Sequence, residues 1–213
     1  MNWKENRFEE SERPKSYEIR SIKATVTSEI LDYGYLKSYH YADPRVYYKI
    51  PIYRMYLEGT TDDNSQAKIP YRVIRFGVVR EKSFEDPSMC GLQKANEYII
   101  KEWTEEAIRL PNNRWLPGWR IYGGHFIHAG PAAPNRVPGA INELASSIGC
   151  IEIINRNFSD FQDATLMLSG AKSYKILGKL GKFTLKIEQA DLPPLLPYDI
   201  MTKQPVPPKP IHR

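Results

Sequence analysis

The chain has 213 residues and a mass of 24.6 kDa, which corresponds to one domain or at most two and is long enough to bury a core. Apolar residues make up 41% of it, and 30 basic against 25 acidic residues give a net charge of +5, so the composition excludes an intrinsically disordered chain. The two cysteines, Cys90 and Cys150, are too few for a disulfide scaffold and suit a reducing compartment.

The ends of the chain differ in composition from its body. Residues 1–16 carry charges of both signs and no apolar core of a Sec signal peptide, and no run of about 18 apolar residues follows. We therefore expect a flexible N-terminal arm over 1–16, a body over 17–190, and a protein that is cytoplasmic at synthesis and does not insert into a membrane. Seven of the 17 prolines fall within 193–210, which predicts an extended tail over 191–213 that covers a sheet edge, crosses a groove or extends freely.

The first half of the body alternates apolar and polar residues. This alternation predicts strands over 18–27, 46–57 and 71–79, with a hairpin loop at the Gly-, Asp- and Asn-rich residues 58–65. Residues 91–110 place apolar side chains at steps of three and four, which predicts an amphipathic helix with Cys90 near its start. The apolar positions of this helix would be Leu92, Ala95, Ile99, Trp103 and Ala107.

The second half is expected to mix short strands with helices. Strands are predicted at 119–122 and 125–127, then a helix at 138–148 that ends before Gly149, and a strand from Cys150 onward. A further helix over 158–168 has Asn157 as its N-cap and Gly170 after its end, and a last strand spans Phe183–Ile187. The expected fold class is α+β, predominantly β-sheet with about three helices.

One region concentrates residues with chemical potential, over 122–131 and 146–152. A histidine raises the thiolate fraction of a nearby cysteine, so His128 and Cys150 form a natural base and nucleophile. His125 lies three residues before His128 and therefore on the opposite face of a strand, which leaves it as a packed histidine or, with Tyr122, as a lining of the substrate site. The remaining histidines and Cys90 are too scattered for a zinc site, so we expect neither a metal nor another cofactor.

The residues around Cys150 suit a nucleophile. Gly149 allows a tight turn that leaves backbone N–H groups free for an oxyanion hole, and Ser147 is small enough for a substrate backbone to approach. Glu152 lies on the same face of the expected strand as Cys150. It is either a polar neighbour of the site or a solvated carboxylate.

The order of the two residues helps to identify a family. The histidine precedes the cysteine by 22 residues, whereas papain-like enzymes have the reverse order. The segments "FIHAGP" and "SSIGCIEI" resemble the catalytic motif of the L,D-transpeptidase (YkuD-like) family, in which a histidine at a strand end precedes a Ser/Thr-His-Gly-Cys element. Two positions depart from that pattern: Ile148 replaces the motif's histidine, and Glu152 replaces an arginine or asparagine.

The resemblance implies roles for the residues that match the motif. Cys150 would be the nucleophile and His128 the general base, with the backbone carbonyl of Ala129 or Gly130 orienting the imidazole. Gly149 and Ser147 would be the small positions before the nucleophile, within a YkuD-like β-sandwich. The implied reaction is cysteine-dependent acyl transfer on peptidoglycan stem peptides, as an L,D-carboxypeptidase with water or an L,D-transpeptidase with an amine.

Peptidoglycan lies outside the cytoplasm, so a chain without a Sec signal needs another route to it. We expect a type VI secretion effector that acts as an antibacterial toxin in the periplasm of a target cell, with a secretion component and an immunity protein as partners; release by phage lysis and a truncated chain are the alternatives. A non-catalytic peptidoglycan- or protein-binding module with a degenerate site is the rival function. A lysine cluster also raises nucleic-acid binding, which so mild a net charge does not favour. The cluster comprises Lys172, Lys175, Lys179 and Lys182.

Overall fold

The computed structural model describes residues 18–37, 45–79, 88–109, 113–130, 149–154, 157–199 and 201–207. These residues form an α+β fold that is predominantly β-sheet and has two helices. The expected arm over 1–16, the expected helix over 138–148 and Ser147 lie outside the described residues.

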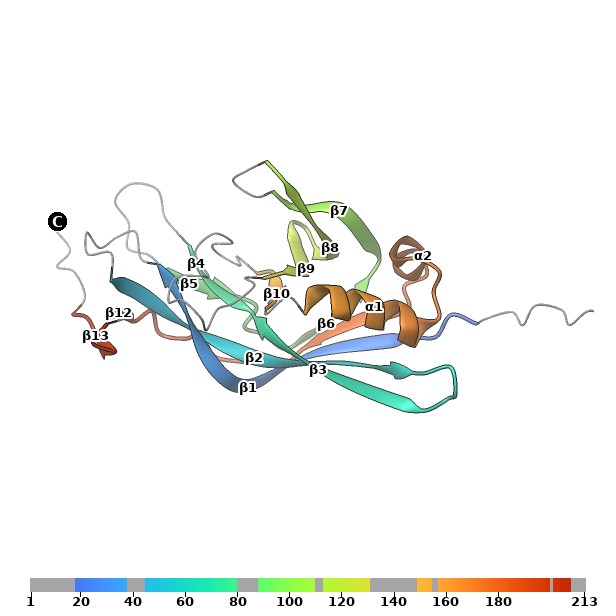
Figure 1. The fold of residues 1–213 in the computed structure, drawn as a ribbon, viewed down its shortest axis with the longest axis horizontal. Helices are drawn as coiled ribbons and strands as arrows, with labels where there is room; N and C mark the ends of the chain where they lie inside the picture. Colours follow the sequence, from blue (N-terminus) through green and yellow to red (C-terminus); the bar gives the residue numbers. More distant parts are fainter. Residues whose placement is uncertain are drawn as a thin grey trace, which may run out of the picture.

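The described elements form one large sheet and one small one (Figure 1). The order in the large sheet is β6-β11-β1-β2-β3-β10-β9-β8-β7, with β12 on β2 and β13 on β12, and β4 pairs with β5 separately. Its pairs are antiparallel except β1–β11 and β9–β10, which are parallel. The strands are β1 (Ile22–Lys37), β2 (Val46–Thr60), β3 (Gln66–Ile74), β4 (Phe76–Val79), β5 (Ser88–Gly91), β6 (Asn96–Ile100), β7 (Glu102–Arg109), β8 (Trp115–Tyr122), β9 (His125–Ala129), β10 (Ile151–Ile153), β11 (Phe183–Ile187), β12 (Pro197–Asp199) and β13 (Gln204–Pro205).

The predicted strands of the first half are confirmed. β1 begins at Ile22 within the first alternating stretch, β2 covers the second, and the third, 71–79, is divided between β3 and β4. β2 and β3 form an antiparallel hairpin from Tyr53 opposite Val73 to Thr60 opposite Gln66. The inward residues of this hairpin are aliphatic and aromatic side chains, buried except near the loop, where Ala67 and Ile69 are half-buried. The other face carries charged side chains such as Arg54 and Arg72. Alternation of this kind fixes the register, because a slip by one residue would expose the whole apolar face.

The large sheet curls around helix α1 (Phe158–Ser169), which lies between the long strands β1–β3 and the β7–β9 region in Figure 1. Phe158 and Phe161 of α1 belong to the same buried cluster as Trp103 of β7 and Trp119 of β8. β6 and β8, which lie near opposite ends of the strand order, also approach one another: the ring of Tyr98 on β6 stacks on that of Tyr122 on β8, at 5.3 Å between centroids. The core therefore sits on the concave side of the sheet.

The amphipathic helix expected over 91–110 is wrong. Of the described residues 91–109, Gly91 ends β5 and most of the others form β6 and β7. Several of their apolar residues are four positions apart, and an even spacing keeps side chains on one face of a strand as well as of a helix. Pairing with β11 decides between the two: Ile100 lies opposite Phe183 and is buried, whereas Ile99 is 54% exposed.

The helix predicted over 158–168 is confirmed as α1. Gly170 follows it with φ 68, in the left-handed region that favours glycine, and donates its N–H to the Leu166 carbonyl. Asn157 is the N-cap residue, but its side chain makes no capping hydrogen bond. The second helix, α2 (Tyr174–Lys179), was not predicted; it has six residues, too few for a clear period, and the Ser173 side chain accepts from the Ile176 N–H.

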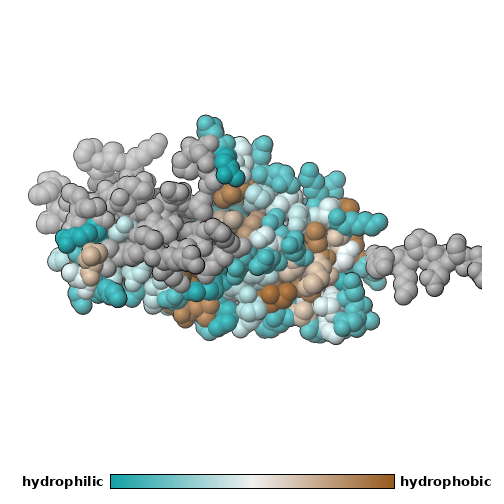
Figure 2. Space-filling model, in the orientation of Figure 1, coloured by the Kyte–Doolittle hydropathy of each residue, from teal (hydrophilic) through white to brown (hydrophobic). Residues whose placement is uncertain are grey.

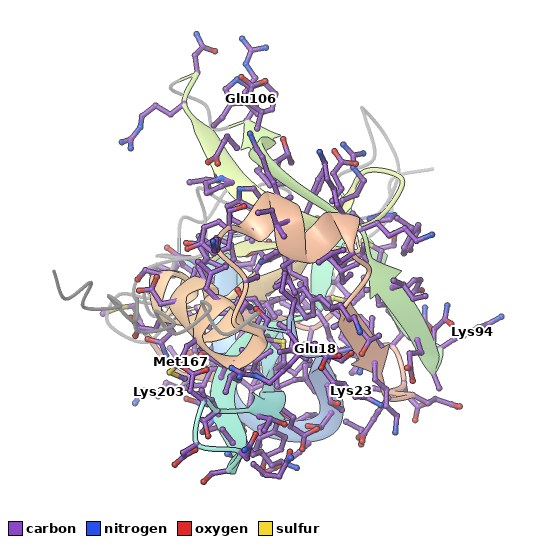
Figure 3. The ribbon with its side chains drawn as sticks, turned by 90° about the vertical axis from the view of Figure 1, so that its right-hand side faces the viewer. Glu18, Lys23, Lys94, Glu106, Met167 and Lys203 are labelled. Carbon is purple, nitrogen blue, oxygen red and sulfur yellow. The ribbon has the colours of Figure 1, made fainter. Side chains whose placement is uncertain are left out.

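The proline-rich tail follows the first of its three expected courses. Its strand β12 pairs antiparallel with β2, from Pro197 opposite Tyr48 to Asp199 opposite Val46, so the tail covers a sheet edge. The part of the surface visible in Figure 2 is largely hydrophilic, and its hydrophobic residues form separate patches. Figure 3 shows charged side chains such as Lys23, Lys94 and Glu106 pointing away from the body.

Candidate functional site

His128 lies in β9, and Cys150 immediately precedes the neighbouring strand β10. β9 and β10 are parallel and in register, with Ile127 beside Ile151 and His128 beside Glu152. Cys150 immediately precedes β10 and is two residues before Glu152, so its side chain lies on the same face of the sheet as those of Glu152 and His128. Strands far apart in the chain therefore bring a thiol, an imidazole and a carboxyl onto one face.

The imidazole of His128 is held in one tautomer by the backbone. It is 3% exposed, and its Nδ1 lies 2.8 Å from the carbonyl oxygen of Ala129. A carbonyl can only accept, so Nδ1 carries the hydrogen, and the Nε2 of the neutral ring keeps a lone pair for a proton. Gly118 lies opposite His128 on β8, where a Cβ would lie 2.9 Å from the Ala107 Cβ and from the Ile127 carbonyl oxygen. A glycine at this position therefore lets β8 pack closely against β9 and Ala107.

Cys150 follows a glycine whose conformation other residues rarely adopt. Gly149 has φ 94, in the left-handed region, and lies at a bend directly before Cys150, while the residues that precede it are outside the described ranges. The Phe126 N–H donates to the Cys150 Sγ at 3.4 Å, and the thiol is 7% exposed. Sequence reasoning did not identify this donor, because it depends on the register between β9 and β10. Cys150 and Cys90 are not joined by a disulfide, and Cys90 lies in β5 instead of at a helix start.

His125 and Tyr122 form an aromatic wall beside the Cys150 turn. A Cβ at Gly149 would lie 2.7 Å from the His125 ring, whose centroid is 4.4 Å from that of Tyr122. Tyr122 is 41% exposed. Its pKa is raised, first by partial burial and then by the nearby Tyr98 and Cys150. Tyr98 extends this wall from β6. It was missed because nothing local in the sequence links residue 98 to residue 122.

Glu152 is a buried carboxyl, which excludes the solvated carboxylate expected as one alternative. It is 2% exposed, and its neighbours Ile151 and Ile153 are fully buried. Burial raises the pKa of Glu152 to about 8. Gly130 makes the close packing possible, because a Cβ there would lie 3.0 Å from the Glu152 Cβ.

Burial also keeps the thiol and imidazole uncharged. It lowers the pKa of His128 to about 4, an effect that the hydrogen bond to Ala129 only partly opposes. It raises the pKa of Cys150 to about 11; the Phe126 N–H lowers that pKa, and the nearby Glu152 raises it. At neutral pH the resting site thus contains a thiol, a neutral imidazole and a protonated carboxyl. Both partners of the proposed proton transfer are therefore neutral before a substrate binds.

The raised pKa of Glu152 predicts a pH-dependent stability. The folded state keeps the proton up to about pH 8, whereas the unfolded state releases it near its ordinary pKa of 4.5. The stabilisation of the folded state by the protonated Glu152 is complete below pH 4.5 and is lost as pH rises to about 8. Glu152→Gln should therefore be more stable than wild type at pH 9, by about 5 kcal/mol at about 1.4 kcal/mol per pKa unit, and similar at pH 4.

Urea unfolding at a series of pH values measures this difference. Glu106→Gln, at an exposed carboxylate, is the matched control and should leave the pH dependence of the free energy of unfolding unchanged. A difference in the free energy of unfolding between Glu152→Gln and wild type that stays constant from pH 4 to pH 9 would contradict the prediction.

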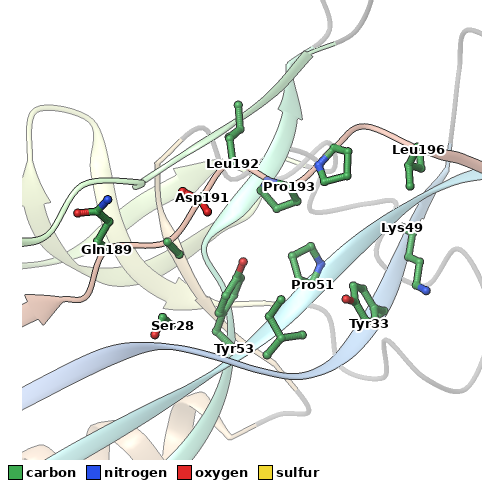
Figure 4. Close-up of a pocket in the computed structure, with 13 residues that line it drawn as sticks. Ser28, Tyr33, Lys49, Pro51, Tyr53, Gln189, Asp191, Leu192, Pro193 and Leu196 are labelled. Carbon is green, nitrogen blue, oxygen red and sulfur yellow. The ribbon is translucent and has the colours of Figure 1, made fainter.

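A separate cavity of about 510 Å³ lies between β1, β2 and the segment 189–196 (Figure 4). Tyr33, Lys49 and Tyr53 face Asp191 and Pro193 across it. The Lys49 Nζ lies 4.1 Å from the centre of the Tyr33 ring. No residue of the predicted Cys150 site is among those that line this cavity.

No protein-family model, curated protein or solved structure matches this chain. Within the described residues, no group of three or more His, Cys, Asp and Glu side chains is placed to hold a metal ion. In the same part of the chain, no helix is long and apolar enough to cross a membrane.

Proposed function

We propose that the chain is an L,D-transpeptidase-like cysteine enzyme, with Cys150 as the nucleophile and His128 as the general base. The observation that carries the proposal is the parallel register of β9 and β10, which puts both side chains on one face, with the His128 Nδ1 hydrogen-bonded to the Ala129 carbonyl. The resemblance of the sequence motif calls for this orienting carbonyl. The proposal includes a YkuD-like β-sandwich over 17–190 as the catalytic domain.

The proposed reaction is acyl transfer from a peptidoglycan stem peptide. The His128 Nε2 takes the proton of the Cys150 thiol while Sγ attacks the carbonyl carbon of the amide before a terminal D-amino acid. Collapse of the tetrahedral intermediate breaks the C–N bond, and the imidazolium returns the proton to the leaving amine. The thioester then passes its acyl group to water, which gives carboxypeptidase action, or to an amine, which gives transpeptidation.

The rival is a non-catalytic module that only binds wall peptides or a protein, and Glu152 in place of the motif's arginine or asparagine favours it.

The test is incubation of purified protein with tetrapeptide muropeptides and a labelled D-amino acid. We expect release of the terminal D-alanine or its exchange for the label, and an acyl adduct on Cys150 in the intact-protein mass. Unchanged muropeptides and an unmodified Cys150 would overturn the enzyme and favour the binding module.

The proposed site of action is the periplasm of a target cell, reached without a Sec signal, as by a type VI secretion effector with an immunity partner. Expression in a Gram-negative host with an added periplasmic signal should stop growth, and cytoplasmic expression should not, because the stem peptides are outside the cytoplasm. Growth counts and microscopy for lysis measure this. Equal harm by both routes would point to an intracellular target.

A further inference from the structure

The cavity between β1, β2 and the segment 189–196 is covered by a stretch of chain that is fixed near both of its ends. The backbone N–H of Ala190 donates to the Gln93 carbonyl at 3.0 Å, and the backbone N–H of Lys49 donates to the Leu196 carbonyl at 3.5 Å. Between these two bonds the chain contains two consecutive prolines, whose rings restrict the backbone. The volume of about 510 Å³ is in the range of small-ligand sites, and the covering segment is held in place without a ligand.

The wall of this cavity contains a buried hydroxyl without a hydrogen-bond partner. Tyr53 is 2% exposed, and within the described residues its hydroxyl makes no hydrogen bond. Figure 4 shows its side chain extending from β2 toward the segment that carries Asp191. Burial raises the pKa of Tyr53 to about 12; the nearby Arg75 lowers that pKa, and Tyr33 and Asp191 raise it. The hydroxyl is therefore a protonated donor at neutral pH, and a buried donor of this kind calls for an acceptor from outside the chain.

Two side chains of opposite charge lie toward opposite ends of the cavity. The Nζ of Lys49 is 4.1 Å from the centre of the Tyr33 ring, whereas Asp191 lies near Tyr53 (Figure 4). Lys49 and Tyr53 are four residues apart on β2, so their Cα atoms are about 13 Å from each other. Within the described part of the chain, neither Lys49 nor Asp191 takes part in an ion pair. The cavity therefore has a positive end and a negative end, and both charges are available to a ligand.

The other charged groups near the cavity are bound within the chain. The Oε2 of Glu188 accepts from the backbone N–H of Ser28 at 3.1 Å and from its hydroxyl at 3.5 Å. Arg75 lies behind Tyr53, with its guanidinium carbon 5.5 Å from the centre of the ring, and its Nε donates to the Leu92 carbonyl at 2.9 Å. Neither Glu188 nor Arg75 is among the residues that line the cavity.

We propose that this cavity binds a short peptide with free ends, with the terminal carboxylate at Lys49, the terminal ammonium at Asp191 and a carbonyl oxygen at the Tyr53 hydroxyl. An extended chain spans at most about 3.3–3.6 Å per residue, so about four residues bridge the two charges. Each end then meets the opposite charge, and the carbonyl supplies the acceptor that Tyr53 lacks. Ile30 and Pro51 give the cavity an apolar lining, which suits small apolar side chains. This peptide site goes beyond the proposed function, because no residue of the proposed catalytic site lines the cavity.

Tetra-alanine with free or capped ends tests the peptide site. Isothermal titration calorimetry at low ionic strength compares the Kd of the free peptide with those of its N-acetylated, C-amidated and doubly capped forms. Each single cap removes one terminal charge and should weaken binding roughly tenfold, as expected for loss of a charge-assisted hydrogen bond. No binding of the free peptide, or an equal Kd for all four forms, would overturn the proposal. The caps act on the ligand, so this comparison does not depend on the folding of a variant.

Variants of the cavity assign each end of the peptide. In Asp191→Asn the N-terminal cap should no longer change Kd, and in Lys49→Met the C-terminal cap should no longer do so, because the charge that each cap removes has lost its partner. Tyr53→Phe removes only the hydroxyl and should weaken all four forms by a similar factor, roughly threefold to tenfold. Lys94→Met and Glu106→Gln, at side chains that point away from the body in Figure 3, are the matched controls and should leave every Kd unchanged. A cap effect that persists in the matching variant would place that end of the peptide elsewhere and overturn the proposal.

Cys150→Ala separates this site from the proposed enzyme. The variant should bind free tetra-alanine with the wild-type Kd, because Cys150 does not line the cavity. Loss of binding in a folded Cys150→Ala variant would place the peptide at the proposed catalytic face and reject the cavity as its site. Binding that depends on Lys49 and Asp191, in a protein that leaves muropeptides unchanged, would retain the peptide site and reject the enzyme.

Discussion

Replacing Cys150 by alanine is expected to abolish release and exchange of the terminal D-amino acid, with a loss of at least about 10⁴-fold in kcat. No acyl-enzyme can form without the thiol, and the second candidate thiol, Cys90, lies in β5, a strand of the separate two-stranded sheet. The change removes a single sulfur atom from a 7% exposed side chain, so the fold should survive it. Muropeptide profiles by liquid chromatography and mass spectrometry measure the loss.

Cys90→Ala is the matched control for Cys150→Ala. Both variants remove one thiol, but only the thiol of Cys150 shares a sheet face with His128. Cys90→Ala should keep wild-type rates, and the urea midpoints of the two variants show whether either change unfolds the chain. Full activity in a folded Cys150→Ala variant would reject Cys150 as the nucleophile.

Local signals in the sequence were sufficient for much of the fold. Alternation and the Gly- and Asp-rich loop predicted the β2–β3 hairpin, and the spacing of Phe158, Phe161 and Leu168 predicted α1. These signals work because one face of each element is buried against the core and the other is not. The order of strands in the sheet, and the two parallel pairs, depend on contacts between distant segments and could not be predicted from such patterns.

The error at residues 91–110 has a related cause. Their four-residue spacing fits a helix and a strand equally well, and the partners that decide between the two lie on β11 and β8, far along the chain. Tyr98, Ile99 and Ile100 are residue types that favour strands, and that composition was the available local signal for β6.

The site was predicted in part for the same reasons. The pattern of residues led to Cys150, His128 and the turn at Gly149, because each has a short-range signature. It did not lead to the Phe126 N–H, the close strand packing at Gly118, or the burial of Glu152, which arise where β8, β9, β10 and β3 meet. The face that carries the proposed chemistry is therefore a product of strand register.

His128→Asn is expected to lower kcat by about 10²- to 10⁴-fold, the usual contribution of a general base. The asparagine amide nitrogen can take the place of Nδ1 and keep a hydrogen bond to the Ala129 carbonyl, but the variant lacks the lone pair of Nε2. His125→Asn is the matched control, and we expect it to alter KM more than kcat because the His125 ring contacts Tyr122 and the Gly149 turn. Equal losses of kcat in the two variants would contradict the assignment of His128 as the base.

The pH dependence of the wild-type enzyme separates a base from a merely packed histidine. The imidazole must be neutral to take the thiol proton, and burial lowers the pKa of His128 to about 4. Activity, as kcat/KM, should therefore persist as pH falls through 6.5, where an ordinary histidine gains its proton, and disappear only near pH 4. An acid limb near pH 6.5 would mean that the reacting histidine is solvated, and would contradict a mechanism in which His128 acts from its buried position beside β10.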